Sequence, residues 1–288
     1  MRWTPQGRSR NLEDRRGSGF RGGAVGMGVG GSLLLVVLSL IFGTDLTSLG
    51  GGGGPAGGTV AESQGDVAVQ ESPEEARLAD FVSFVLDTNQ VFWARTLPQA
   101  TGQQYRDAKL VLFRNVVQSG CGTAQSAMGP FYCPLDEKVY IDLGFYDELR
   151  QRFGAPGDFA QAYVLAHEIG HHVQHVLGID QEVRRAQQSQ PGQANPLSVR
   201  LELQADCFAG VWGHSAAQGP EPILQSGDVE EGLNAAAAIG DDRLQRQSGG
   251  GVNPEGFTHG SSAQRVAWFR RGLESGDPNV CDTFQDLR

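Results

Sequence analysis

The chain is poor in basic residues. Its 288 residues include 23 Lys and Arg against 33 Asp and Glu, which gives a formal net charge of −10. Six arginines fall within residues 1–23, where they outnumber Glu13 and Asp14 and give a net charge of +4. The rest of the chain is therefore strongly acidic and lacks the concentrated basic face that phosphate binding needs. This excludes nucleic acid as an expected partner.

The sequence also lacks a CxxC pair, which argues against a cysteine zinc knuckle. Its four cysteines are Cys121, Cys133, Cys207 and Cys281, an even number that fits two disulfides formed in an oxidising compartment. Three pairings are possible. The short hairpin-like segment between Cys121 and Cys133 favours joining these two, which leaves Cys207 to pair with Cys281. Four buried free thiols are the alternative.

Charge is absent from residues 24–43, and residues 33–42 are strongly apolar. At about 1.5 Å per residue, twenty helical residues just cross a hydrocarbon core of about 30 Å. Because no convincing small-x-small cleavage pattern follows, we expect a retained transmembrane anchor, with a cleaved signal peptide as the alternative. The preceding arginines then predict a cytoplasmic tail over residues 1–23 and place the remaining chain outside the cell membrane.

Glycine is concentrated just after this segment, in residues 50–58, and a polar acidic run continues to about residue 72. Such a composition cannot bury enough apolar surface to order itself, so residues 44–72 are predicted to form a flexible linker. The folded domain is expected over residues 73–288.

Within that domain, hydrophobic spacing predicts a helix, then a small sheet, then further helices, an order typical of a mostly helical α+β domain. The first helix covers about 76–97 with Ser72 as its N-cap. Asp158 and Gly178 are expected to begin and end the next helix. The expected strands are 109–113, 131–133 and 139–143, the last two forming a hairpin, and the later helices are about 159–177, 197–217, 228–247 and 261–274.

Histidine is scarce, with six residues, yet His167 and His171 lie four positions apart in the helix predicted over 159–177. At that spacing both side chains project from one helix face and can share a metal ion. Glu168 follows the first ligand and would act as the general base that takes a proton from water. The alternative, two surface histidines, leaves Gly170 unexplained, because glycine inside a helix costs roughly 1 kcal/mol relative to alanine.

The pattern HExxHxxGxxH is incomplete, since Gln174 and Leu177 occupy its glycine and last histidine positions. The next predicted helix offers Glu202 and Asp206, four residues apart on one face. We expect Glu202 to be the third ligand and Asp206 to accept the outward N–H of a ligating imidazole. The main alternative exchanges these two roles, and a further one is an acid pair on a solvated helix face. Two histidines and a carboxylate favour a single zinc ion over Mg²⁺ or Ca²⁺.

The remaining histidines differ in context. His172 and His214 are expected to be structural or surface residues, and His175 to pack near the ligands. His259 follows a glycine-rich loop, which would let it approach the metal and stabilise an oxyanion. A helix-capping role near Ser261 is the alternative for His259.

Several segments resemble the bacterial putative neutral zinc metallopeptidase family, whose members are membrane-anchored and related to the zincins with a Glu third ligand. The segments are residues 129–134, 166–174, 201–210 and 257–265. The resemblance implies a zincin-like metallopeptidase domain that follows one N-terminal transmembrane helix.

Together these patterns predict zinc-dependent hydrolysis of peptide or protein substrates outside the cytoplasmic membrane. An extended substrate is expected to pair with an exposed strand, for which residues 139–143 are the candidate. One alternative is an amidase acting on cell-wall peptides. Another is a non-catalytic anchored scaffold, in which the zinc is structural and its fourth ligand would have to be His259 or Cys207.

Overall fold

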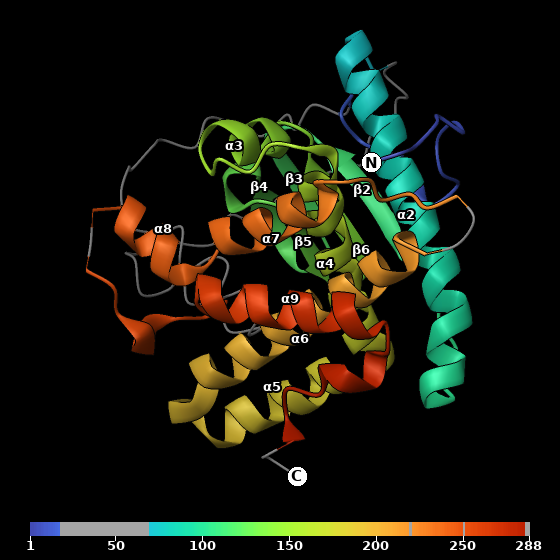
Figure 1. Cartoon of the computed structure of the whole chain (residues 1–288). Coiled ribbons are helices and arrows are strands. Elements are labelled where there is room, and N and C mark those ends of the chain that lie inside the picture. Colours follow the sequence, from blue (N-terminus) through green and yellow to red (C-terminus); the bar gives the residue numbers. More distant parts are fainter. Residues whose placement is uncertain (18–68, 219–220, 250, 286–288) are drawn as a thin grey trace, which may run out of the picture.

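The computed structural model describes residues 1–17, 69–218, 221–249 and 251–285 (Figure 1). In these ranges helices predominate over strands. The strands are β1 Leu12–Asp14, β2 Lys109–Phe113, β3 Val116–Ser119, β4 Gly122–Gln125, β5 Phe131–Cys133 and β6 Lys138–Asp142. The α-helices are α2 Pro73–Thr101, α3 Phe145–Gln151, α4 Asp158–Val176, α5 Ile179–Ser189, α6 Ala194–Ala216, α7 Asp228–Ala238, α8 Asp241–Gln247 and α9 Ser262–Ser275.

The main sheet has four strands in the order β1-β2-β6-β5, in which β1, β2 and β6 are parallel and β5 is antiparallel. The hairpin predicted from residues 131–133 and 139–143 is therefore confirmed. The expectation that residues 139–143 form the exposed strand is wrong, because β6 has a hydrogen-bonded neighbour on each side. The edge strand on that side of the sheet is β5.

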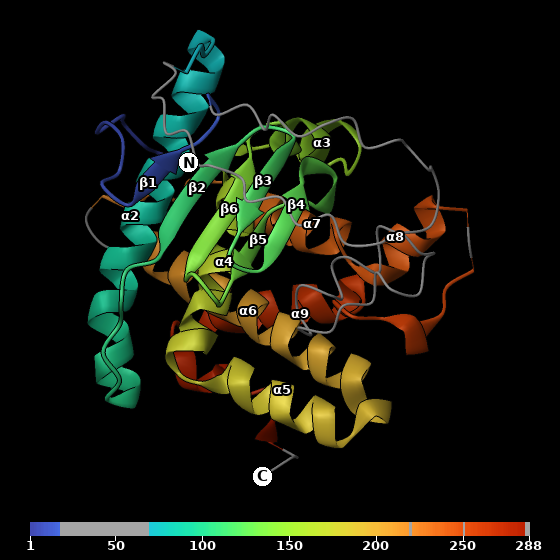
Figure 2. The ribbon, with the colours of Figure 1, turned by 180° about the vertical axis from the view of Figure 1, so that it is seen from behind.

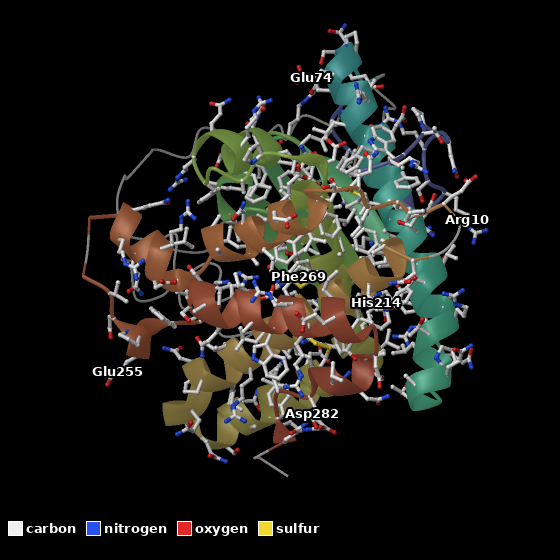
Figure 3. All side chains as sticks on the ribbon, in the orientation of Figure 1. Arg10, Glu74, His214, Glu255, Phe269 and Asp282 are labelled. Carbon is white, nitrogen blue, oxygen red and sulfur yellow. A yellow bond between two sulfur atoms is a disulfide. The ribbon has the colours of Figure 1, made fainter. Side chains whose placement is uncertain are left out.

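The helices form a second layer against the sheet. Figures 1 and 2 show the sheet in the upper half of the molecule, α2 along one side and α5, α6 and α9 in the lower half. Helices α6 and α9 approach so closely that a Cβ on Gly272 would collide with the carbonyl of Cys207. Phe269 of α9 is 1% exposed and lies at the centre of the molecule (Figure 3), where its ring contacts those of Phe159 and Tyr163.

Most of the helix predictions are confirmed within a few residues, and Ser72 caps α2 through a reciprocal capping box with Glu75. The single helix expected over 228–247 is wrong, since it is divided into α7 and α8 at Gly240. A side chain at Gly240 would collide with the backbone of Ser262, so this glycine lets the loop before α9 pack against the break. Helix α5 was not predicted, because only Val183 and Gln187 of its residues are buried.

The start of α4 differs from the expected cap. Gly157 is the N-cap, with φ 120°, and Asp158 is the first helical residue rather than the cap. The Glu231 carboxylate of α7 accepts the hydrogen bond from the Phe159 N–H at 3.1 Å, so a distant side chain performs the capping. At the other end, Gly178 is left-handed with φ 76° and directly follows the C-cap residue, as predicted.

The domain boundary predicted at residue 73 is corrected by the N-terminal residues. Strand β1 pairs with β2, with Leu12 opposite Leu110, and the Trp3 ring packs on Phe81 of α2 with ring centroids 5.1 Å apart. Residues 1–17 therefore belong to the folded unit and do not form a separate tail. The sequence did not indicate that this segment docks on the domain. Its arginines suggested membrane topology, and its strand has only three residues.

The predicted anchor at residues 24–43 and most of the predicted linker lie outside the described residues. Among the helices of the described ranges, none combines the length and apolar character that crossing a membrane requires.

Both predicted disulfides are present, Cys121–Cys133 and Cys207–Cys281, and the described residues contain no free cysteine. The first links the turn between β3 and β4 to the last residue of β5. The second ties the middle of α6 to the C-terminal residues after α9, over a sequence separation of 74 residues.

Reduction should therefore destabilise the protein, and the longer loop should contribute more. In the loop-entropy model, the 12-residue separation corresponds to about 3 kcal/mol and the 74-residue separation to about 4 kcal/mol. Thermal melting of the C121S/C133S and C207S/C281S variants, compared with the wild type, measures each contribution. A melting temperature that reductant leaves unchanged, although all four thiols become alkylated, would contradict this expectation.

Candidate metal centre

The site forms where α4 crosses α6. At the crossing, a Cβ on Gly170 would lie 2.9 Å from the Ala205 carbonyl oxygen, closer than side-chain atoms normally approach. Gly170 therefore allows the two helix backbones to meet, which accounts for a glycine inside a helix. This close approach brings the α6 side chains of Glu202 and Asp206 to the face of α4 that carries the predicted histidines.

Three of the predicted residues meet at one point. The ligand atoms of His167, His171 and Glu202 all lie within 4.8 Å of one another. The His167 Nε2 atom is 3.2 Å from Glu202 Oε2, and the His171 Nε2 atom is 3.4 Å from Glu202 Oε1. All three side chains are largely buried.

This geometry fits a zinc ion. Zinc bonds of about 2.0–2.1 Å in a tetrahedral arrangement place neighbouring ligand atoms roughly 3.3 Å apart. The two histidine nitrogens lie 3.2 and 3.4 Å from different oxygens of Glu202, close to that value, and one ligand atom from each of the three residues lies within 4.8 Å of the others. Two imidazoles and one carboxylate are also a common ligand set of catalytic zinc sites. His167, His171 and Glu202 would therefore hold the ion.

The opposite nitrogen of each imidazole is held by a second side chain. His167 Nδ1 donates to Asp206 Oδ1 at 2.8 Å, the contact that the sequence predicted. His171 Nδ1 donates to the Gln174 side-chain oxygen at 2.8 Å, which the sequence analysis missed. Both rings are thus fixed in the tautomer that presents Nε2 to the metal.

Asp206 is the centre of a buried ionic network, and it is 0% exposed. Arg265 of α9 donates to both of its oxygens, each at 2.8 Å, and the Tyr163 hydroxyl of α4 donates to Oδ1 at 2.5 Å. Arg265 and Tyr163 were not singled out from the sequence, because their positions along the chain give no sign of a contact with Asp206. A carboxylate with four such contacts is committed to orienting His167, which supports Glu202 rather than Asp206 as the ligand.

Electrostatics keep His167 and Glu202 charged when no metal is present. Burial alone would lower the pKa of His167, but the Asp206 and Glu202 carboxylates outweigh it and raise the pKa to about 9. Burial alone would raise the pKa of Glu202, but His171 and His259 outweigh it and hold it well below its ordinary value. The proton on His167 therefore occupies the position that a metal ion would take.

Glu168 lies beside these ligands on α4 and is 8% exposed. Burial raises the pKa of its carboxyl group, and the nearby His167 and His171 oppose that rise in part. The net upward shift moves this carboxyl toward the range in which it can both accept and return a proton near neutral pH.

His259 lies close enough to the centre to lower the pKa of Glu202, although it is not among the three clustered ligands. It does not cap α9, whose N-cap is Ser261, so the capping alternative is not supported. Asp241 holds the loop, because its Oδ2 accepts the N–H groups of Thr258, His259 and Gly260 at 2.8, 2.7 and 3.0 Å. The other oxygen of Asp241 lies 3.3 Å from His259 Nδ1.

The remaining histidines have structural partners. His172 is 0% exposed and joins α4 to β5 through the Tyr132 hydroxyl at 2.9 Å. His175 contacts Asp180 at 2.9 Å, and His214 donates to the Leu273 carbonyl at 2.8 Å. The predicted structural reading of His172 agrees with these contacts.

A helix that carries His-Glu-x-x-His, joined by a glutamate from a second helix, is the arrangement of zincin-type metallopeptidases. The comparison with protein families agrees with this class. The family model described as "putative neutral zinc metallopeptidase" matches residues 1–284, and the chain belongs to this family.

Similar chains occur in several bacteria. The chain is 50% identical to the uncharacterized protein YpfJ of Escherichia coli (strain K12), over 99% of each chain. It is 48% identical to the uncharacterized proteins Mb2605 of Mycobacterium bovis and Rv2575 of Mycobacterium tuberculosis, over 67% of this chain and 66% of each relative. No solved structure is significantly similar to the chain.

The two carboxylates of α6 should differ in their effect on metal retention. Glu202→Ala should release zinc almost as completely as His167→Ala, because two protein ligands hold zinc poorly. Asp206→Asn should weaken zinc binding by about 10–100-fold, since the imidazole remains but loses its orienting partner. Zinc occupancy during a chelator titration ranks the two variants. Easier release from Asp206→Asn than from Glu202→Ala would exchange their roles.

Zinc affinity should also rise with pH. A metal ion must displace the His167 proton, whose pKa is about 9 in the metal-free protein. Below that value each unit of pH lowers the proton competition by about tenfold, so the affinity should increase by about that factor between pH 7 and pH 8. Competition against a chelator with known pH dependence measures the slope. Asp206→Asn should flatten the slope, and a flat wild-type profile would contradict the expectation.

Proposed function

We propose that the protein is a zinc-dependent peptidase that hydrolyses peptide bonds of peptide or protein substrates outside the cytoplasm. The observation that carries the proposal is the convergence of His167, His171 and Glu202 beside the buried carboxyl of Glu168. One zinc ion is the proposed cofactor.

A zinc ion at this centre would polarise the scissile carbonyl and acidify the attacking water. Glu168 takes the proton from that water and returns it to the leaving amine, so the peptide bond breaks while water adds to the carbonyl carbon. His259 is the proposed donor to the oxyanion. Burial alone would lower its pKa, but the Glu202 and Asp241 carboxylates outweigh burial and raise it, so the imidazolium can donate from Nδ1 to Asp241 and from its other ring nitrogen to the substrate. Asp206 and Gln174 keep the ligand rings in place.

The substrate is proposed to lie along β5. This strand is at the edge of the sheet next to α4, so an extended peptide can pair with it as a further strand. The Tyr132–His172 hydrogen bond fixes β5 against the metal-binding helix. Beyond the end of β5 lies a cavity of about 350 Å³, lined by Pro134, His175 and Arg184 among others. A substrate that follows the strand would continue toward this cavity.

The alternative of a structural zinc in a non-catalytic scaffold is less well supported. A structural zinc site normally uses four protein ligands, whereas the described residues bring three candidate ligands together. Cys207 is bonded to Cys281 and has no thiolate to offer, and His259 is not among the three clustered ligands. An open fourth position favours catalysis.

The proposed compartment is extracytoplasmic. Two disulfides in the described residues fit an oxidising environment, since disulfides are rare in the bacterial cytoplasm. Membrane attachment through residues 24–43 stays a prediction, because those residues lie outside the described part of the chain.

The Glu168→Gln variant tests the proposed function directly. It should retain wild-type zinc content and lose peptidase activity by at least about 100-fold, because glutamine can neither accept nor return the proton. Turnover of a peptide library by the zinc-loaded protein, followed by mass spectrometry, provides the measurement.

Glu182→Gln is a matched control, since Glu182 is exposed on α5 away from the metal ligands. This variant should behave as the wild type. Substantial activity in Glu168→Gln would remove Glu168 from the role of general base. Absence of zinc-dependent turnover in the wild-type protein across the library would remove support for the peptidase itself.

A further inference from the structure

The N-terminal residues are fixed to the domain at several independent points. All three residues of β1 have partners in β2, where Leu12, Glu13 and Asp14 lie opposite Leu110, Val111 and Leu112. Beyond the strand, the Glu13 carboxylate accepts from Lys138 of β6 at 2.8 Å. Backbone pairing and side-chain contacts thus place this segment on the sheet together.

The chain leaves the described structure after Gly17 and returns at Val69, and these two points are held together. Arg16 donates to Asp14 at 2.5 Å and to Glu71 at 2.6 Å, and its side chain is 1% exposed. Arg8 also contacts Glu71 at 3.0 Å and Asp80 of α2 at 2.9 Å. Separating the buried Arg16 guanidinium from its carboxylate partners is costly, because a buried charge would then be left without compensation.

These contacts conflict with a single membrane crossing between residues 17 and 69. A single crossing would place β1 on one side of the membrane and β2, Lys138 and Glu71 on the other. It would break the strand pairing and leave Arg16 without Glu71. Cleavage of residues 24–43 as part of a signal peptide would likewise separate β1 from the mature chain.

The arginine signal that predicted a cytoplasmic N-terminus has a different role in the structure. Arg8, Arg15 and Arg16 each contact a carboxylate, so their charges contribute to folding contacts. The positive-inside rule counts Lys and Arg near the ends of a span and gives Asp and Glu little weight. In the folded chain, contacts with Glu13, Glu71 and Asp80 give these arginines a second role, which is to hold the N-terminal segment to the domain.

We propose that residues 1–17 and the metallopeptidase domain lie on the same side of the membrane. The proposal differs from the predicted arrangement of a cytoplasmic tail and an external domain. The inference does not depend on zinc binding or on peptidase activity.

Labelling of single introduced cysteines in the full-length protein tests the proposal. Arg10→Cys marks the N-terminal segment and Glu255→Cys marks the domain; both positions are exposed at the periphery and far apart (Figure 3). The native cysteines are paired and should not react, so the wild type gives the background. A membrane-impermeant maleimide is applied to intact spheroplasts, and again after permeabilisation.

Equal accessibility at both positions supports the proposal. If both react in intact spheroplasts, the domain is extracytoplasmic; if both react only after permeabilisation, they share the cytoplasm, and the proposed compartment fails while the shared side stands. Reaction at one position alone before permeabilisation would overturn the proposal.

Exchange of the Glu13–Lys138 ion pair provides a second measurement. Glu13→Lys and Lys138→Glu should each lower the melting temperature by a few degrees, and the double exchange should restore most of the loss. Strictly additive losses in the double variant would mean that Glu13 and Lys138 do not interact, which would count against docking of β1 on the sheet and therefore against the proposal.

Discussion

The structure depends on one buried carboxylate. Asp206 is fully buried on α6, and its charge is balanced by Arg265 of α9 and by Tyr163 and His167 of α4. Breaking a buried ion pair on one side typically costs about 3–5 kcal/mol, so the three helices must remain close together. Gly170 lets the backbones of α4 and α6 meet, and glycines between α6 and α9 do the same. The orientation of His167 therefore follows from the packing of the core.

The sequence predicted the parts of the site that repeat at helical spacing. Glu168 and its two neighbouring histidines lie within five residues of one helix, and Glu202 precedes Asp206 by one turn, so their shared faces follow from local geometry. Partners of these residues were missed where the contact is not local. Arg265 lies 59 residues beyond Asp206 in the chain, and its contact depends on how α9 crosses α6. The order of the strands also depends on long-range pairing, which is why β6 and not β5 was expected at the edge.

Composition was a weaker guide at the N-terminus. A charge count records arginines but does not show which of them pair with carboxylates. Arg16 and Glu71 are 55 residues apart in the chain and nevertheless form a largely buried ion pair. Short strands such as β1 carry too few residues for alternation to identify them. The overall charge of residues 1–17 therefore predicted a separate tail, whereas in the folded chain its arginines pair with individual carboxylates.

The Cys207–Cys281 bridge has a consequence for the order in which the protein matures. A chain of hydrogen bonds leads from the Cys281 carbonyl to the Gln204 amide at 3.0 Å, on to Gln174 at 3.1 Å and then to His171 at 2.8 Å. Formation of the Cys207–Cys281 disulfide thus holds the Cys281 carbonyl in place. This carbonyl is the last group of a hydrogen-bond relay that orients His171. A newly made chain completes this relay only after the residues that follow α9 have folded onto α6. The orientation of one candidate metal ligand therefore depends on a disulfide between segments that lie 74 residues apart in the chain.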